Sequence, residues 1–150
     1  IRIGGATEIE VTEKKHRVED ALEAVRSAQE EGIVAGGGTA LLKAANNIEI
    51  EPSNQDQLRG AQTLVQSCFA PINQILKNAE ISSDIVVSSL THDDHEKNVG
   101  FNVRSEKFEN LVETGVIDPA KTVKCALRNA ASAAGTLLTT NCAVLQKGGE

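Results

Sequence analysis

The most informative stretch of the chain is residues 30–41, which read EEGIVAGGGTAL. Gly32 follows a helical pattern and stands where glycine often ends a helix, because glycine adopts the left-handed conformation without steric cost. Three apolar residues then lead into Gly36–Gly38, and Thr39 is a suitable N-cap for a second helix that runs through Ala45. The stretch therefore predicts the end of one helix, a glycine turn and the start of another.

The segment before this turn is predicted to be a long helix that follows extended chain. Residues 1–12 alternate loosely around Gly4-Gly5, which predicts two short extended segments. A helix is predicted between Lys14 and Glu31, because five apolar residues there have the spacing of one helix face. These residues are Val18, Ala21, Leu22, Val25 and Ala28.

The segment after the turn predicts further helices. Residues 46–54 are polar and contain a proline, which indicates a loop. A helix begins near Gln55 and is interrupted at Pro71, because proline lacks the N–H that a helix interior needs. Either Ser82 or Ser83 is expected to cap another short helix, which runs through Leu90.

The last third of the chain predicts a hairpin and one more helix. After a polar loop at Thr91–Asn98, apolar residues alternate over 99–103 and a turn follows at 104–106, which is typical of a small hairpin. Asp118-Pro119 predicts a helix start, with aspartate as N-cap and proline in the first helical position. The apolar segment Cys142–Leu145 is predicted to be a short strand. The fold class is mainly α with small β elements.

The composition describes an acidic chain with an aliphatic core. Fifteen Lys+Arg against 21 Asp+Glu give a net charge of −6, whereas nucleic-acid-binding domains normally carry a basic face. Three Phe and no Trp or Tyr leave few rings on which bases could stack. No apolar run reaches the ~20 residues of a membrane span. We therefore expect neither nucleic acid nor a membrane as a partner.

Methionine, cysteine and histidine give further expectations. Methionine is absent, also from position 1, which predicts that the chain is a piece of a longer protein. Cys68, Cys125 and Cys142 are odd in number and far apart, which favours reduced thiols over disulfides or a zinc site. His92 and His95 flank acidic residues like a pair of metal ligands, but no further spaced ligands accompany them. A hydrated loop is the favoured interpretation, and no metal site is predicted.

Three features are candidates for a functional site, and each also has a structural explanation. Gly36–Gly38 would let the backbone approach a phosphate or a base at a helix N-terminus, or simply form a tight turn. Asp20 lies opposite the apolar helix face, where a solvated acidic surface is the alternative. Asp118 is expected to cap its helix, and its carboxylate has a second oxygen that can accept hydrogen bonds from vicinal hydroxyls such as those of ribose.

Two long motifs closely resemble the signature of the group I chaperonins. They are residues 14–22, KKHRVEDAL, and residues 30–41. Gly100-Phe101-Asn102, Gly115–Pro119 and Ala130–Gly135 are similar to later landmarks of that family and occur in the same order. The resemblance covers essentially all 150 residues. It implies two portions of a chaperonin subunit: the C-terminal part of the intermediate domain at 1–30, and the C-terminal part of the equatorial, ATP-binding domain at 31–150.

The resemblance also implies part of an ATP site. In the family, a carboxylate at the position of Asp20 orients or activates the attacking water. A glycine turn lies against the nucleotide, three residues line the adenine and a carboxylate holds the ribose. The matching residues are Gly36, Gly37 and Gly38 for the turn, Asn102, Val103 and Arg104 for the adenine, and Asp118 for the ribose. The family usually has small residues after the asparagine, so Val103 and Arg104 favour backbone contacts with the adenine.

For the intact protein the resemblance implies ATP hydrolysis in a ring of like subunits, coupled to the folding of non-native polypeptides beneath a co-chaperonin lid. The location implied is the bacterial cytoplasm or an organelle matrix. The phosphate loop and its Mg²⁺-binding aspartate would lie outside this chain, so the fragment alone is expected to be inactive. Two other interpretations remain: a structural or assembly module in which the glycines and Asp118 only shape the backbone, and a metal protein that uses His92 and His95.

Overall fold

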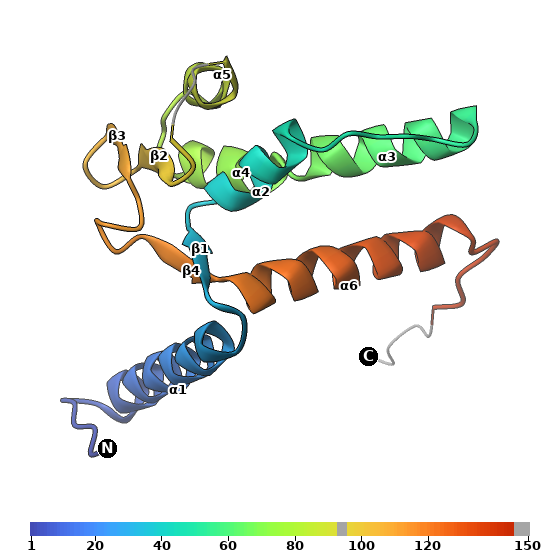
Figure 1. The fold of residues 1–150 in the computed structure, drawn as a ribbon. Coiled ribbons are helices and arrows are strands. Elements are labelled where there is room, and N and C mark those ends of the chain that lie inside the picture. Colours follow the sequence, from blue (N-terminus) through green and yellow to red (C-terminus); the bar gives the residue numbers. More distant parts are fainter. Residues whose placement is uncertain (93–95, 146–150) are drawn as a thin grey trace.

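The structure is a computed structural model that describes residues 1–92 and 96–145 (Figure 1). The described part is mainly helical with two small sheets, which confirms the predicted fold class. The helices are α1 (Glu8–Glu31), α2 (Thr39–Asn46), α3 (Gln55–Ser67), α4 (Ala70–Asn78), α5 (Ser83–His92) and α6 (Ala120–Leu138), and the strands are β1 (Ile33–Ala35), β2 (Val99–Asn102), β3 (Lys107–Asn110) and β4 (Ile117–Pro119).

The small sheet of β1 and β4 lies between two groups of elements. The strands are antiparallel, with Val34 opposite Asp118 and Ala35 opposite Ile117. In Figure 1 this sheet lies between α1 and α6 on one side and α2, α4, α5 and the β2–β3 hairpin on the other. It therefore brings the glycine turn after β1 close to Val116, which precedes β4, and it brings Gly32 close to the start of α6.

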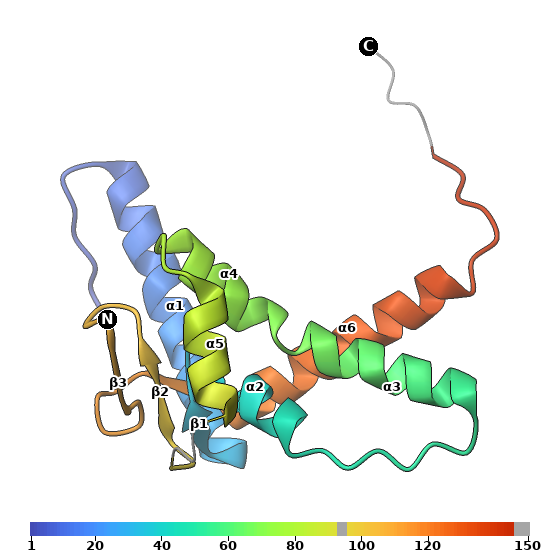
Figure 2. The same ribbon diagram turned by 90° about the horizontal axis from the view of Figure 1, so that it is seen from above.

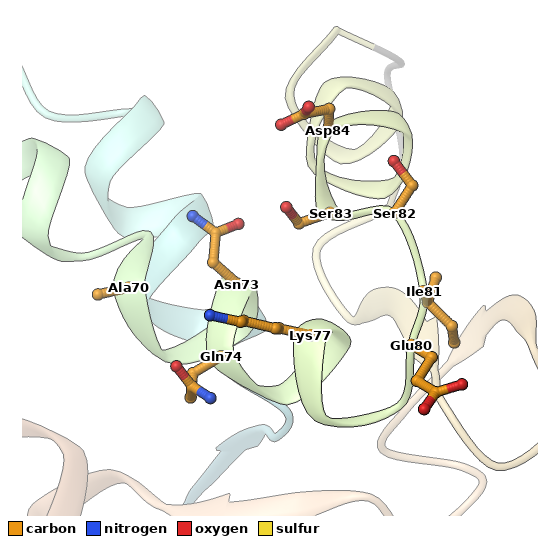
Figure 3. A pocket seen from close by; sticks show the side chains of 9 residues that line it. All are labelled: Ala70, Asn73, Gln74, Lys77, Glu80, Ile81, Ser82, Ser83 and Asp84. Carbon is orange, nitrogen blue, oxygen red and sulfur yellow. The ribbon is translucent and has the colours of Figure 1, made fainter.

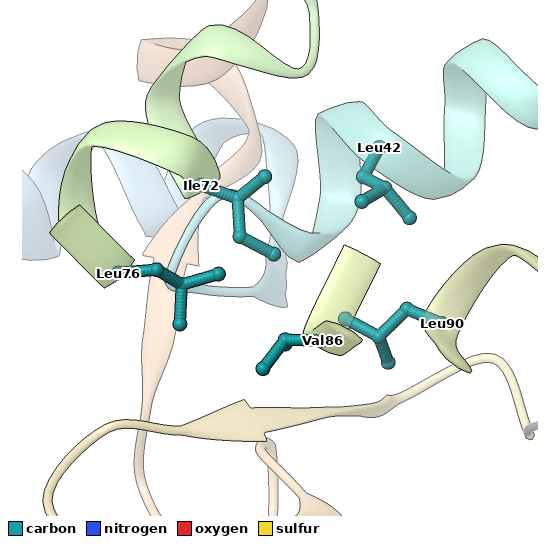
Figure 4. Packing of buried hydrophobic residues seen from close by; sticks show 5 residues of the cluster. All are labelled: Leu42, Ile72, Leu76, Val86 and Leu90. Atoms are coloured by element: carbon teal, nitrogen blue, oxygen red, sulfur yellow. The ribbon is translucent and has the colours of Figure 1, made fainter. Parts of the chain in front are cut away.

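The main core is aliphatic, as the composition predicts, and lies among α2, α4 and α5 (Figure 4). Phe101 and Val103 of the hairpin region pack against this cluster. The five buried residues are Leu42, Ile72, Leu76, Val86 and Leu90. Because α2 contributes Leu42, the core fixes the helix that follows the glycine turn.

The start of α1 differs from the prediction. The chain is helical from Glu8, where the sequence predicts extended segments. The Thr7 hydroxyl accepts the Glu10 N–H at 3.2 Å, and the Glu10 carboxylate accepts the Ala6 N–H at 2.8 Å. This reciprocal arrangement resembles a capping box, which satisfies N–H groups that would otherwise lack a partner. The cap outweighs the weak alternation of the apolar residues at 9 and 11.

Two predicted helix caps are wrong by one residue. Gly38, in the left-handed conformation, is the N-cap of α2, and Thr39 is the first helical residue. Pro119 is the N-cap of α6, so Asp118 lies in β4 and its side chain does not cap the helix. At α6, strand β4 extends through Pro119 directly to the helix, which moves the cap by one residue.

Two further predictions of secondary structure are confirmed, and two are wrong. The helix from Gln55 ends before Pro71, which lies in the first turn of α4, and the predicted hairpin forms with its turn between β2 and β3. Cys142–Leu145 is not a strand. Thr91 and His92 belong to α5 instead of a loop, and His95 lies outside the described residues. None of the helices in the described ranges is long and apolar enough to cross a bilayer.

Candidate functional site

The glycine turn is attached to the chain that leads into β4. The Gly36 N–H donates to the Val116 carbonyl at 2.9 Å, and the Thr39 N–H donates to the Gly36 carbonyl at 3.1 Å. A Cβ on Gly36 would lie 3.1 Å from the same Val116 oxygen, a tight approach that glycine avoids. The hydrogen bond therefore depends on a residue without a side chain at this position.

The next two glycines have different roles. Both have positive φ, 64° at Gly37 and 78° at Gly38, which side-chain-bearing residues rarely adopt. A Cβ on Gly38 would lie 2.8 Å from the Ile72 backbone nitrogen, so this glycine is needed for packing. At Gly37 nothing lies within 4 Å of the Cβ position. This side of the turn is open to a ligand.

Asp118 lies within reach of the same region. It is directly opposite Val34, two residues before Gly36. The side chain is half-buried, and burial raises the pKa of its carboxyl. Within the described ranges no hydrogen bond or ion pair engages the carboxylate. Its oxygens are therefore available to accept hydrogen bonds from a ligand's hydroxyls.

The hairpin packs directly against the start of α2. A Cβ on Gly100 would lie 2.5 Å from Thr39 Oγ1 and 2.5 Å from a methyl of Leu111. The Thr39 hydroxyl is buried and has no hydrogen-bond partner in the part of the chain that the structure describes. This close contact places the middle of β2 next to Thr39, the residue that follows the glycine turn.

The three residues predicted to line an adenine have distinct environments. The Asn102 side chain is engaged within the hairpin: its Nδ2 donates to Glu109, and its Oδ1 accepts the Arg104 N–H at 3.0 Å. The Val103 side chain packs against the main core, whereas Arg104 is exposed. Because Asn102 and Val103 already have structural partners, their backbone groups are the parts best placed to contact a base.

Asp20 lies apart from these residues. It is exposed in the middle of α1, and no hydrogen bond or ion pair of the described residues involves it. The helix extends away from the β1–β4 sheet toward the N-terminus (Figure 1). It joins the sheet through Gly32, whose φ is 80°. The structure thus brings together the glycine turn, Asp118 and the hairpin, and it leaves Asp20 on a separate helix joined at one glycine.

A groove lies elsewhere, between α4 and α5 (Figure 3). Asn73 of α4 and Ser83 of α5 extend into the space between the helices, and Lys77 and Asp84 lie at its margins. The groove is shallow and open, and none of the predicted site residues lines it. Within 1–92 and 96–145, no group of three His, Cys, Asp or Glu side chains is arranged to hold a metal ion.

Sequence reasoning missed two residues that shape the site. Val116 acts through its carbonyl oxygen, so no side-chain pattern could have indicated it. Gly100 is a glycine inside a strand, and that placement is a recognised signal of close backbone approach. The signal was available in the sequence, but the approaching partner, Thr39, is far away in the chain.

Comparison with known proteins identifies the family and the fold. Residues 1–148 match the TCP-1/cpn60 chaperonin family. The structure is similar to the crystal structure of a group III chaperonin in the open state, with a TM-score of 0.82 and 24% sequence identity over 95% of this chain. The match covers 30% of that chaperonin chain, so the present chain spans under a third of its length. By its sequence and its fold, the chain belongs to the TCP-1/cpn60 chaperonin family.

Proposed function

We propose that this chain is part of an ATP-driven ring chaperonin that assists the folding of non-native polypeptides. Residues 1–30 would belong to its intermediate domain and residues 31–150 to its equatorial domain. The observation that carries this proposal is the β1–β4 register, with Val34 opposite Asp118 and Gly36 bonded to Val116. This register puts an unpartnered carboxylate opposite Val34, two residues before the open glycine turn, an arrangement that would suit a nucleotide.

The residues present fit an adenine nucleotide. The open side of Gly37 lets a phosphate or ribose approach the backbone at the start of α2, where free N–H groups favour negative charge. Asp118 offers carboxylate oxygens to the ribose hydroxyls. Backbone groups of Asn102, Val103 and Arg104 at the hairpin turn would contact the base. Together these residues position the nucleotide but supply little of the charge that its phosphates need.

Asp20 has the chemistry to act on water. Phosphoryl transfer depends on positioning and electrostatic stabilisation, with a side chain that orients the attacking water. A carboxylate that is exposed and unpaired, as Asp20 is, can accept a hydrogen bond from that water. A bound Mg²⁺ would neutralise charge on the phosphates, and we expect its protein ligand outside this chain. Asp20 would reach the site by movement of α1 about Gly32.

The finer assignment is to the group I chaperonins. The motifs at residues 14–22 and 30–41 support it, whereas the similar solved structure is a group III chaperonin. Group I membership implies a ring of like subunits, a separate co-chaperonin lid, and a bacterial cytoplasm or organelle matrix as location. Refolding assays with and without an added co-chaperonin test this point, since a protein that encloses its client unaided would exclude a separate lid.

The central test is nucleotide binding and hydrolysis by the assembled protein. Asp20→Ala should retain ATP affinity and lose turnover, because its carboxylate acts on water and does not hold the nucleotide. Asp118→Ala should weaken ATP binding. Glu19→Ala, which removes an exposed carboxylate beside Asp20, is the matched control and should change neither quantity. Circular dichroism and assembly size establish that each variant is folded.

The structural-module alternative predicts a different outcome. On that view both aspartates only maintain the fold, so Asp20→Ala and Asp118→Ala would lower stability equally with and without ATP. Folded variants that bind and hydrolyse ATP like the parent protein would refute the proposed site. Stoichiometric zinc that is lost on replacing His92 would instead support the metal-protein alternative.

A further inference from the structure

Glu109 of the β2–β3 hairpin holds the side chain of Asn102. Asn102 Nδ2 donates a hydrogen bond to Glu109 Oε1, and the Ser105 hydroxyl donates to the same oxygen at 3.2 Å. In the strand register Glu109 lies opposite Gly100, which has no side chain to pair with it. Directly opposed residues, and residues two apart on one strand, share a face of the sheet. The Glu109 side chain therefore lies on the same face as that of Asn102.

The two partners of the Asn102 side chain determine which way its amide group is turned. The Arg104 N–H needs an acceptor and donates to Asn102 Oδ1 at 3.0 Å. The Glu109 carboxylate needs a donor and accepts a hydrogen bond from Nδ2. An asparagine amide has its acceptor on one side and its donors on the other, so only one of its two orientations satisfies both partners. Without Glu109, only the contact with Arg104 would restrain this amide.

The contact between Asn102 and Arg104 sets the direction of a main-chain carbonyl. The peptide bond between Val103 and Arg104 is trans, and the carbonyl and N–H of a trans peptide point in opposite directions. Because the Arg104 N–H points at the Asn102 amide, the Val103 carbonyl points away from it. This carbonyl accepts no hydrogen bond from the residues that the structure describes. It is therefore available as an acceptor for a ligand.

The turn at residues 103–106 depends on contacts that enforce its shape. Glu106 has a φ of 55°, which residues with a side chain rarely adopt. Such a conformation persists only where the surrounding structure enforces it. The Val103 side chain anchors one end of the turn against the main core. Across the rest of the turn, the two hydrogen bonds accepted by Glu109 restrain Asn102 and Ser105. Loss of this carboxylate would therefore let the peptide between residues 103 and 104 rotate.

The direction of this peptide decides which purine the turn can bind. Adenine carries an amino group at C6, which donates hydrogen bonds, whereas guanine and hypoxanthine carry an oxygen there, which accepts them. The Val103 carbonyl would accept a hydrogen bond from the amino group and repel the oxygen. If the peptide turned over, it would present the Arg104 N–H instead and favour the oxygen.

We propose that Glu109 is a positioning residue that makes the turn at 103–106 selective for 6-aminopurines over 6-oxopurines. It acts through the Asn102 amide on the direction of the Val103 carbonyl and does not itself contact the base. This inference rests on the proposed function, because it requires a nucleotide whose base lies at this turn. It adds the residue that would set the choice of base.

The test compares the affinities of the assembled protein for ATP and inosine triphosphate, measured by titration calorimetry. Inosine triphosphate has an oxygen at C6 and lacks the 2-amino group of GTP, so the comparison isolates position 6. The parent protein should prefer ATP. Glu109→Ala should lower the ratio of the two affinities about tenfold, the size expected for one mismatched hydrogen bond. Glu109→Gln keeps an oxygen that can accept from Asn102 Nδ2 and should retain the parent ratio.

A second pair at the other end of β3 supplies the matched control. Asn110 Nδ2 donates to the Glu113 carboxylate at 2.9 Å, and Asn110 Oδ1 accepts backbone N–H groups of the residues that follow. Glu113→Ala therefore removes the same kind of contact and should leave the affinity ratio unchanged. Asn102→Ala should lower the ratio as much as Glu109→Ala does, and combining the two should add nothing, because both act through one contact. Circular dichroism and assembly size establish that each variant is folded.

The outcomes separate this inference from the proposed function. An unchanged affinity ratio in folded Glu109→Ala would overturn the inference. A Glu109→Gln variant that behaves like the alanine variant would also overturn it, because the charge and not the hydrogen bond would then set the ratio. A parent protein that binds ATP but does not prefer it to inosine triphosphate would overturn the inference and leave nucleotide binding intact. A parent protein that binds neither nucleotide would refute both.

Discussion

The contact between the hairpin and α2 predicts that Gly100→Ala is strongly destabilising. The added Cβ would lie 2.5 Å from both Thr39 Oγ1 and Leu111 Cδ1, about 1 Å closer than an ordinary contact of 3.4–4 Å. Thr39 is 1% exposed and Leu111 is fully buried, so neither can swing into solvent. The two elements must separate to admit one methyl group.

The expected loss is about 2 kcal/mol of unfolding free energy. Overpacking a tight site costs about 1–3 kcal/mol, and the reduced entropy of the unfolded chain returns about 0.4–1 kcal/mol at most. Because two buried atoms are crowded at once, we place the cost at the upper end of the range. A loss of 2 kcal/mol lowers the folding equilibrium constant by about thirtyfold.

Urea unfolding followed by far-ultraviolet circular dichroism measures this loss, since the chain has no Trp or Tyr to serve as a fluorescent probe. Gly60→Ala is the matched control, because Gly60 lies inside α3 with nothing within 4 Å of its Cβ position. There alanine should stabilise by about 0.5–1 kcal/mol through helix propensity. If Gly100→Ala is as stable as the parent, the hairpin does not pack against α2 as described.

Three other substitutions test separate contacts. Thr39→Val should raise the urea midpoint by removing a buried hydroxyl that lacks a partner. Thr7→Ala should lower the helix signal of α1 and cost about 1 kcal/mol, whereas Thr12→Ala, whose hydroxyl bonds only to a helix carbonyl, should cost less. Burial raises the pKa of Asp118, so the folded state binds more protons and loses stability as pH rises through that pKa. The stability of Asp118→Asn relative to the parent should therefore grow between about pH 3 and 7, and an unchanging difference would contradict the burial of this carboxyl.

Much of the fold can be predicted from local features of the sequence. Pro71 requires a break between α3 and α4, because its ring cannot occupy a helix interior. The alternation around Phe101 and the turn after it specify the hairpin, since its pairing is local. These features can be interpreted without knowledge of the tertiary structure.

The prediction errors occur where contacts between distant segments, or helix capping, determine the local structure. The N-cap of α6 moves to Pro119 because β1 pairs with Asp118, a contact between residues 84 positions apart. The helix at Glu8 depends on the reciprocal bonds of Thr7 and Glu10, a pattern that weak apolar alternation obscured. Segment 142–145 is apolar but has no strand beside it, so its composition alone does not make it a strand.

The candidate site likewise combines features that the sequence predicts with features that it does not. The local motif predicts the glycine turn, and pairing with β4 brings Asp118 beside it. The sequence cannot show that the Asn102 side chain donates a hydrogen bond to Glu109, because that bond depends on the hairpin register. Asp20 lies on α1, apart from these residues, and local sequence patterns do not give the orientation of that helix relative to the turn.

The contact between Gly38 and Ile72 implies that a ligand bound at the glycine turn would affect the core of the protein. The turn rests on the main chain of α4 at a distance that admits no Cβ, and Ile72 belongs to the main aliphatic cluster. A molecule that immobilises the turn would therefore slow amide hydrogen exchange in α4 and α5, remote from its own contacts. Ligand binding at a small surface loop would thus be measurable as slower hydrogen exchange in the interior of the protein.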